Sequence, residues 1–219
     1  MALLYRARES WPEFASYEED KENSDEKYTE RYKEERPIFW DMTNIHLPKP
    51  SDAQLQRLTF SSYYNENCLK GGIGLQTLGW IRTHDLWTGC ASDTCYQAQS
   101  GIFEIQKGFA ELDLVDGKKK PFTNIFDKGY RNRLVAWLAG EQLTLQPSFA
   151  SSDRKFRRAE TLSSAVIASD RSGNERAVRL TKMAGYINQG LHHRQSMERL
   201  DMAWKCWGFQ INFMFNAVM

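Results

Sequence analysis

The sequence predicts a mixed α/β fold in which a five-stranded sheet is flanked by helices. Short apolar runs rich in β-branched and aromatic residues alternate with segments of helical spacing. In chain order these are three strands, a helix, a strand, a helix, a strand and further helices, an alternation typical of mixed α/β domains. The 41% hydrophobic content of the 219 residues suits one sizeable core with an appendage.

Three strands are expected in the first half of this domain. Residues 37–47, "PIFWDMTNIHL", are apolar and β-prone and contain Asp41, which predicts a central strand. After a polar segment, residues 69–89 read "LKGGIGLQTLGWIRTHDLWTG". Two short apolar runs there flank "TLGW", as the strands of a hairpin flank their turn, so the second and third strands are expected to be antiparallel neighbours.

Helices and strands then alternate. Residues 92–112 carry apolar side chains at a mixed spacing of three and four, which predicts a helix weakened by Gly101. The run "FTNIF" at 122–126 predicts the fourth strand. Residues 132–141, "NRLVAWLAGE", predict a short helix, and residues 142–149, "QLTLQPSF", predict the fifth strand.

The last third is expected to be a polar arm followed by two helices. Residues 151–172 are polar and basic and predict a loop or an inserted arm. Asn174 is a candidate N-cap for a helix over 175–191. The apolar face of that helix is expected to comprise Val178, Met183, Ala184, Ile187 and Leu191. Residues 196–216 are apolar on one side and should pack on the sheet.

Charge divides the chain into two parts. Residues 1–36 hold 11 acids and 7 bases, a net charge of −4, with few large apolar residues, so we expect a flexible or marginally helical lead-in. Residues 37–219 hold 17 acids and 22 bases, a net charge of +5, and form the predicted domain. Within residues 118–210 there are 17 bases and 8 acids, which suits either an anionic partner such as nucleic acid or an ordinary solvated basic face.

Two classes of protein are excluded. The four cysteines have no paired CxxC spacing, so neither a disulfide framework nor a zinc knuckle is expected. No apolar stretch approaches the roughly 20 residues that span a bilayer, so we expect a soluble intracellular protein without a membrane partner.

Three acids stand where a metal site can form: Asp41 within the first strand, Asp127 at the end of the fourth, and Glu175 at the start of a late helix. An ionised carboxylate buried at a strand end is costly unless it is paired, and a divalent cation is one partner that offsets the cost. Two such ions drive an in-line phosphodiester displacement without a Ser or Cys nucleophile. The three acids therefore predict Mg²⁺ or Mn²⁺ ligands.

Each acid also has an ordinary structural explanation. Asp41 could face solvent on an edge strand, and Asp127 could open a turn. Glu175 could pair with Arg179 one turn later. Singly these patterns are weak, and their order along the chain carries the metal-site prediction.

That order resembles a known family. The stretches "FWDMTNI", "LKGGIGLQTLGWI", "LWTGCASD", "FDKGY" and "NERAVRLTK" are similar to the catalytic domain of DDE transposases of the Harbinger/IS5-like group, over residues 37–216. The family's first Asp lies in a D-G-T-like strand, its second precedes Gly-Tyr, and its third acid begins an E-R helix that also carries Lys. The matching positions are Asp41, Asp127, and Glu175 with Lys182. Met42 departs from the pattern, since the family has Gly there.

The resemblance implies an RNase H-like fold that cuts DNA with Mg²⁺ or Mn²⁺ and then transfers a 3′-hydroxyl. It implies Asp41, Asp127 and Glu175 as catalytic metal ligands. "TGCASD" is similar to a Pro-Gly-x-x-x-D-like stretch of the family and places Asp93 near the site as a further candidate ligand. The residues expected to contact DNA are Lys128, Arg131, Arg179 and Lys182. For Arg179 and Lys182, an ordinary solvated helix face is the alternative.

The resemblance also sets expectations for partners and location. The partners are DNA at transposon ends and target, with a separate DNA-binding protein and a second copy of the chain left open, because a helix-turn-helix region usually precedes this domain and residues 1–36 do not resemble one. The location is the nucleus in a eukaryote and the cytoplasm otherwise.

Two other functions compete with a nuclease. A haloacid-dehalogenase-like phosphatase would also place an acid at the end of an apolar strand, but it needs a second Asp two residues later, and Thr43 stands there. The alternative of another class is a domesticated or truncated transposase-derived module that binds DNA or protein without catalysis.

Overall fold

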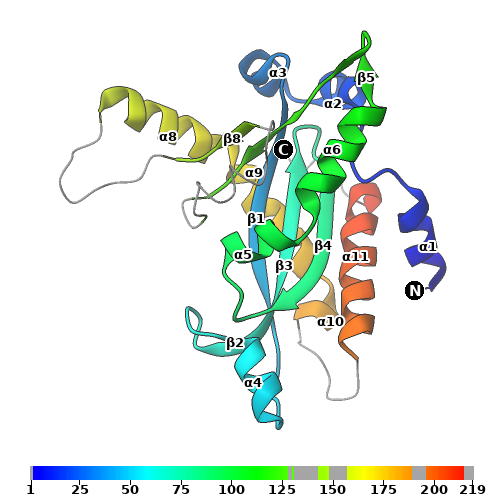
Figure 1. The fold of residues 1–219 in the computed structure, drawn as a ribbon, viewed down its shortest axis with the longest axis vertical. Coiled ribbons are helices and arrows are strands. Elements are labelled where there is room, and N and C mark those ends of the chain that lie inside the picture. Colours follow the sequence, from blue (N-terminus) through cyan, green and yellow to red (C-terminus); the bar gives the residue numbers. More distant parts are fainter. Residues whose placement is uncertain (1, 128–129, 131–142, 148–156, 189–195, 215–219) are drawn as a thin grey trace.

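The computed structural model of the chain describes residues 2–127, 130, 143–147, 157–188 and 196–214. Figure 1 labels its elements. The helices are α1 (Ala2–Ser10), α2 (Tyr17–Asn23), α3 (Glu26–Tyr32), α4 (Ala53–Thr59), α5 (Asp93–Gln99), α6 (Ile102–Leu112), α8 (Arg158–Asp170), α9 (Ser172–Lys182), α10 (Gly185–Asn188) and α11 (Met197–Met214). The strands are β1 (Arg36–His46), β2 (Phe60–Ser61), β3 (Glu66–Gln76), β4 (Ile81–Thr88), β5 (Leu114–Val115), β6 (Lys118–Lys119), β7 (Phe122–Ile125) and β8 (Leu143–Leu145).

The main sheet contains the five predicted strands in the order β4-β3-β1-β7-β8, and the two-residue β2 extends it beside β3. β3 runs antiparallel to both β1 and β4, which confirms the predicted hairpin. β1, β7 and β8 are parallel neighbours. The carboxyl ends of β1 and β7 therefore point the same way, which matters for the acids they carry.

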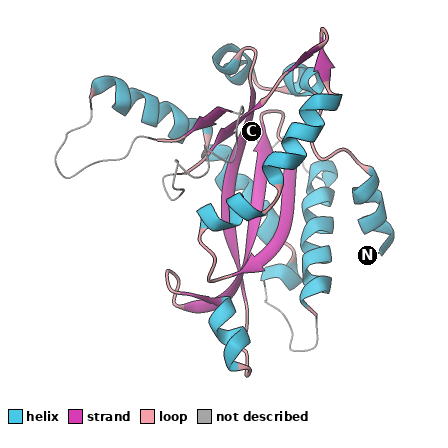
Figure 2. Cartoon of the chain, in the orientation of Figure 1, coloured by secondary structure: helices cyan, strands magenta, loops and turns pink. Residues whose placement is uncertain are grey.

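Two hydrophobic cores lie on opposite faces of the sheet. Along β1, Phe39 and Ile45 belong to the core that contains Trp204 of α11, whereas Trp40 belongs to the core that contains Phe103 of α6. α9 and α11 cover the first face, and α6 covers the second (Figures 1 and 2). A mixed sheet in this strand order with helices on both faces is the RNase H-like fold that we predicted.

Glycines of β3 let large rings lie directly on the sheet. A Cβ added at Gly71 would lie 2.7 Å from Cζ2 of Trp204, and one added at Gly74 would lie 2.7 Å from Cζ3 of Trp40. Both distances are shorter than any ordinary carbon contact. The run "KGGIG" is therefore a packing requirement of both cores.

The N-terminal segment, expected to be a flexible or marginally helical lead-in, is helical and packs on the domain. It forms α1, α2 and α3, and Phe14, Tyr28 and Tyr32 are buried. Phe14 joins the core on the α6 face, while the two tyrosines join the core on the α9 face. Residues 2–35 thus contribute side chains to both sides of the domain, although their composition is acidic. A domain boundary at residue 37 stays a prediction.

Other expectations need correction. The helix predicted over 92–112 is two helices, since Gly101 adopts φ +71°, a left-handed conformation that ends α5 and precedes α6. Residues 158–170, expected in a loop or arm, form α8. α9 begins at Ser172, so Asn174 lies buried inside its first turn and is not the cap. Met183, expected on the apolar face, is exposed.

Some expected elements fall wholly or partly outside the described residues: the helix at 132–141, parts of the segments 142–149, 151–172 and 196–216, and Leu191. In the ranges that are described, no helix is both long enough and apolar enough to cross a membrane.

Candidate metal centre and cleft

Asp41 lies where β1 extends beyond β7. β7 pairs with β1 from Arg36 to Phe39, so no strand among the described residues flanks Asp41 on that side. Alternation along β1 places Asp41 on the same face as Phe39, towards α9. The carboxylate accepts a 2.9 Å hydrogen bond from the N–H of Met42, and 28% of the side chain is exposed. Asp41 is therefore a partly buried acid, and the alternative of a side chain that simply faces solvent is wrong.

Asp127 follows β7 and is held by a turn. The N–H of Tyr130 donates to the carbonyl of Asp127 over 3.2 Å. The side chain of Gln146, just after β8, donates to this same carbonyl and, at 2.7 Å, to that of Tyr130. The expectation that Asp127 opens a turn is thus confirmed for its backbone. Its carboxylate has a separate role, since it takes part in an ion pair with α8–α9.

Arg171, at the junction of α8 and α9, brings the two aspartates together. One guanidinium nitrogen lies 3.1 Å from Oδ1 of Asp127, and the other lies 3.9 Å from Oδ2 of Asp41. The first distance is that of a hydrogen-bonded ion pair, and the second is a longer electrostatic contact. Acids separated by 86 positions therefore share one cation.

The junction that carries Arg171 is anchored to the N-terminal segment. The preceding residue, Asp170, is buried, accepts a 2.7 Å hydrogen bond from the hydroxyl of Tyr32, and pairs with Arg31. The hydroxyl of Tyr28 also donates to the backbone carbonyl of Asp170 over 3.4 Å. α3 thereby fixes the point at which α9 begins.

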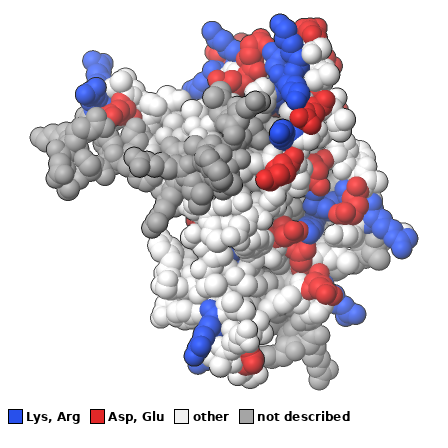
Figure 3. All heavy atoms as spheres, viewed as in Figure 1, with Lys and Arg blue, Asp and Glu red and all other residues white. Residues whose placement is uncertain are grey.

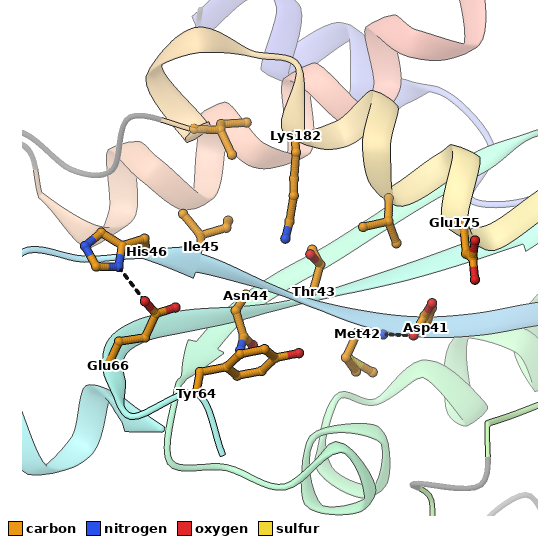
Figure 4. A pocket seen from close by; sticks show the side chains of 12 residues that line it. Asp41, Met42, Thr43, Asn44, Ile45, His46, Tyr64, Glu66, Glu175 and Lys182 are labelled. Carbon is orange, nitrogen blue, oxygen red and sulfur yellow. Dashed lines mark hydrogen bonds and ion pairs between the residues drawn. The ribbon is translucent and has the colours of Figure 1, made fainter. Parts of the chain in front are cut away.

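Glu175 reaches the site from the first turn of α9. It lies four residues after Arg171 and therefore on the same side of the helix. Figure 4 shows the carboxylates of Glu175 and Asp41 facing each other from α9 and β1. Glu175 and Asp41 line one end of a cleft of about 420 Å³. Glu175 thus shares the cleft with Asp41, and Asp127 is linked to Asp41 through Arg171.

The cleft continues from the acids along the free edge of β1. Residues 41–46 line one side, α9 and α10 line the other, and Tyr64 lies beside Asn44. The ammonium of Lys182 points into the cleft (Figure 4), and it has no ion-pair partner in the described part of the chain. Nδ2 of Asn44 is buried there without a hydrogen-bond partner. An unpaired cation in the cleft suits a ligand that carries negative charge.

The surroundings of Asp41 change its pKa. Burial raises the pKa of Asp41 above its ordinary value, and the negative charges of Asp127 and Asp93 raise this pKa further. The charge of Arg171 and the N–H of Met42 act in the opposite direction, but burial outweighs them. Ionisation of Asp41 therefore lowers the free energy of unfolding of the metal-free chain.

The first prediction follows from this cost. Because the folded pKa of Asp41 is raised, ionisation disfavours folding, and the penalty is full only above the folded pKa. Asp41→Asn should therefore stabilise the protein in EDTA at pH 7 to 8 by about 0.5 to 1 kcal/mol. The gain should shrink as the pH falls towards the ordinary pKa of Asp. Urea denaturation at several pH values measures it.

Asp93→Asn is the matched comparison. Asp93 begins α5, and its Oδ1 forms an ion pair with Nζ of Lys70 over 2.6 Å. Removing the charge of Asp93 should therefore not stabilise the protein at any of these pH values. A destabilised Asp41→Asn variant at neutral pH would show that the contact with Arg171 outweighs burial.

The other predicted residues divide into two groups. Asp93 is held by Lys70 and acts on Asp41 only through its charge. Arg179 is exposed and does not line the cleft. Lys128 and Arg131 lie outside the described residues. Sequence reasoning missed Arg171, Tyr64 and Asn44; only Arg171 had a usable signal, its position four residues before Glu175.

A metal fits the chemistry of the donors but not yet their spacing. Among the described residues, no three Asp, Glu, His or Cys side chains are grouped closely enough to hold one ion. Asp41 and Asp127 nonetheless offer carboxylate oxygens, the ligands that Mg²⁺ and Mn²⁺ prefer. The same oxygens already hold the guanidinium of Arg171.

Charge elsewhere on the surface is mixed. Figure 3 shows both signs crowded together over α2, α3 and the β5–β6 hairpin. Lys119 there pairs with Glu111 at 2.9 Å, and Lys120 pairs with Glu34. Two of the three lysines of "DGKKKP" are therefore neutralised locally, so this stretch is not an open basic patch.

Comparison with known proteins gives one match. The sequence model of a family described as DDE superfamily endonuclease matches residues 40–209, which is most of the chain and includes the three acids. No curated protein and no solved structure matches.

Proposed function

Since the chain belongs to the DDE superfamily endonuclease family, we propose that it is a metal-dependent DNA endonuclease and strand transferase of a DNA transposon. The observation that supports the proposal is that Arg171 links Asp41 to Asp127, while Glu175 lines the same cleft as Asp41.

The roles of the residues follow from their places. Asp41, Asp127 and Glu175 would hold Mg²⁺ or Mn²⁺, which when bound supplies activation of the attacking oxygen and stabilisation of the leaving one. Lys182 would bind a backbone phosphate of the DNA strand in the cleft. In-line attack by water would break the bond between phosphorus and the 3′-oxygen, leaving a 3′-hydroxyl on one end and a 5′-phosphate on the other. That 3′-hydroxyl would then attack a phosphorus of the target strand, forming a new phosphodiester bond and displacing the target strand's 3′-oxygen as a 3′-hydroxyl.

The non-catalytic alternative has an observation in its favour. Arg171 already offsets the charge of Asp41 and Asp127, so the fold does not need a metal to keep these acids. A transposase-derived module that only binds DNA or protein could therefore keep the same residues.

Plasmid nicking separates the two functions. The purified full chain should convert supercoiled plasmid to nicked circles in Mg²⁺ or Mn²⁺, and EDTA should stop the reaction. Asp127→Asn should not nick, because it removes a charged oxygen ligand. Nicking that persists in Asp127→Asn would point to a contaminating nuclease or a different site. DNA binding without any nicking would favour the non-catalytic module.

A further inference from the structure

Arg171 lies between two of the acids that we propose as metal ligands. Its side chain is only 15% exposed, its two terminal nitrogens face Asp127 and Asp41, and its Nε is buried without a hydrogen-bond partner. The residue lies at the start of α9, one turn before Glu175, so it shares a helix face with the third acid. Arg171 is thus directed into the acid cluster by the fold itself.

A guanidinium and a divalent ion would compete for these acids. Both are attracted to the carboxylates of Asp41 and Asp127, which Arg171 already contacts. Their charges also repel, and in a partly buried site this repulsion is screened less than it would be in water. Metal binding therefore requires Arg171 to move away from at least one aspartate.

The displaced guanidinium would need another anion. Leaving an arginine partly buried and unpaired is costly, and DNA in the adjoining cleft supplies phosphates, which guanidinium groups bind in bidentate fashion. A phosphate bound next to the acids would draw Arg171 from them and would open the oxygens to metal.

We propose that Arg171 is a resident counter-ion that competes with the divalent metal and transfers to a DNA phosphate, so that metal and DNA bind with positive coupling. The inference rests on the proposed function. Its consequence is that the metal-free chain binds metal weakly until DNA is present. Thermodynamic linkage requires the converse, that metal strengthens DNA binding by the same factor.

Metal affinity without DNA tests the competition. Isothermal titration of the full chain with Mn²⁺ should give about fivefold tighter binding for Arg171→Gln than for the unmodified protein. The reason is that the ion pair between Arg171 and Asp127 no longer has to be broken. Arg171→Lys, which keeps the charge without the forked geometry, should lie between the two. Arg176→Gln, an exposed arginine of the same helix, should leave the affinity unchanged.

DNA affinity tests the coupling. Fluorescence anisotropy of a short labelled duplex should show about fivefold tighter binding in Ca²⁺ than in EDTA for the unmodified chain, with the duplex confirmed intact on a gel. In Arg171→Gln this factor should fall to less than twofold, and in Arg176→Gln it should persist.

The outcomes separate this inference from the proposed function. Mn²⁺ affinity that is unchanged or weaker in Arg171→Gln, with nicking retained by the unmodified chain, overturns the competition and leaves the nuclease proposal standing. Absence of Mn²⁺ binding in every variant overturns both. If Arg171→Gln is unfolded by circular dichroism, Arg171→Lys decides the question alone, and an affinity no tighter than that of the unmodified chain then refutes the inference.

Discussion

Replacement of Asp170 with Asn is expected to lower the free energy of unfolding by about 3 kcal/mol. Asp170 is 2% exposed, receives the hydroxyl of Tyr32 at 2.7 Å and pairs with Arg31. Asn keeps the shape but loses the charge, which leaves a buried tyrosine hydroxyl with a weaker acceptor and an arginine without its acid. Because 36% of the Arg31 side chain is exposed, solvent limits that part of the loss.

Urea denaturation followed by circular dichroism measures the change. Tyr32→Phe removes only the hydroxyl and should cost about 1 kcal/mol, less than Asp170→Asn. Glu30→Gln, on the exposed side of α3, should have no measurable effect. If Asp170→Asn costs no more than Tyr32→Phe, the ion pair with Arg31 contributes nothing to stability.

The same substitution should affect the acid cluster at a distance. Asp170 anchors the residue before Arg171, and α9 carries Glu175 only five residues after Asp170. Loosening of this junction would let both side chains drift relative to Asp41. The N-terminal helices are therefore part of the support of the site, although their composition had suggested an independent lead-in.

The structure of the N-terminal segment could not be predicted from its average composition. Residues 1–36 have a net charge of −4, and average properties of that kind predict disorder. The segment nevertheless contributes the buried rings of Phe14, Tyr28 and Tyr32. A few well-placed aromatic rings fold a polar segment only when a surface exists to receive them, and that surface is made by strands far along the chain.

The positions of Asp41 and Asp127 were predictable because the reason for them is local. Asp41 lies within one apolar run that predicts a strand, and Asp127 follows another. Parallel strands bring their carboxyl ends to the same edge of the sheet. The contact of Arg171 was not predictable in this way. It depends on where α8 ends and α9 begins, and the loop or arm expected over 151–172 concealed that boundary. Sequence periodicity indicates helices well and their ends poorly.

Glu175→Gln and Lys182→Gln are expected to separate chemistry from binding. Both residues belong to α9 and line the cleft, but one faces Asp41 and the other points into the adjoining part of the cleft (Figure 4). Glu175→Gln removes the charge of a proposed metal ligand and should reduce the nicking rate roughly a thousandfold, about 4 kcal/mol of transition-state stabilisation. Its DNA affinity in EDTA should be nearly unchanged, since no positive charge is lost.

Lys182→Gln should have the opposite signature. Loss of one phosphate contact should weaken DNA binding in EDTA about equally for every sequence and reduce the slope of log affinity against log salt by about 1. At saturating DNA its nicking rate should stay within roughly tenfold of the unmodified chain, because Lys182 lies away from the acids along the cleft. Arg176→Gln controls for the general loss of positive charge from α9 and should keep the full salt slope. A salt slope unchanged in Lys182→Gln would mean that the DNA strand does not follow the free edge of β1, even if Glu175 proves essential for nicking.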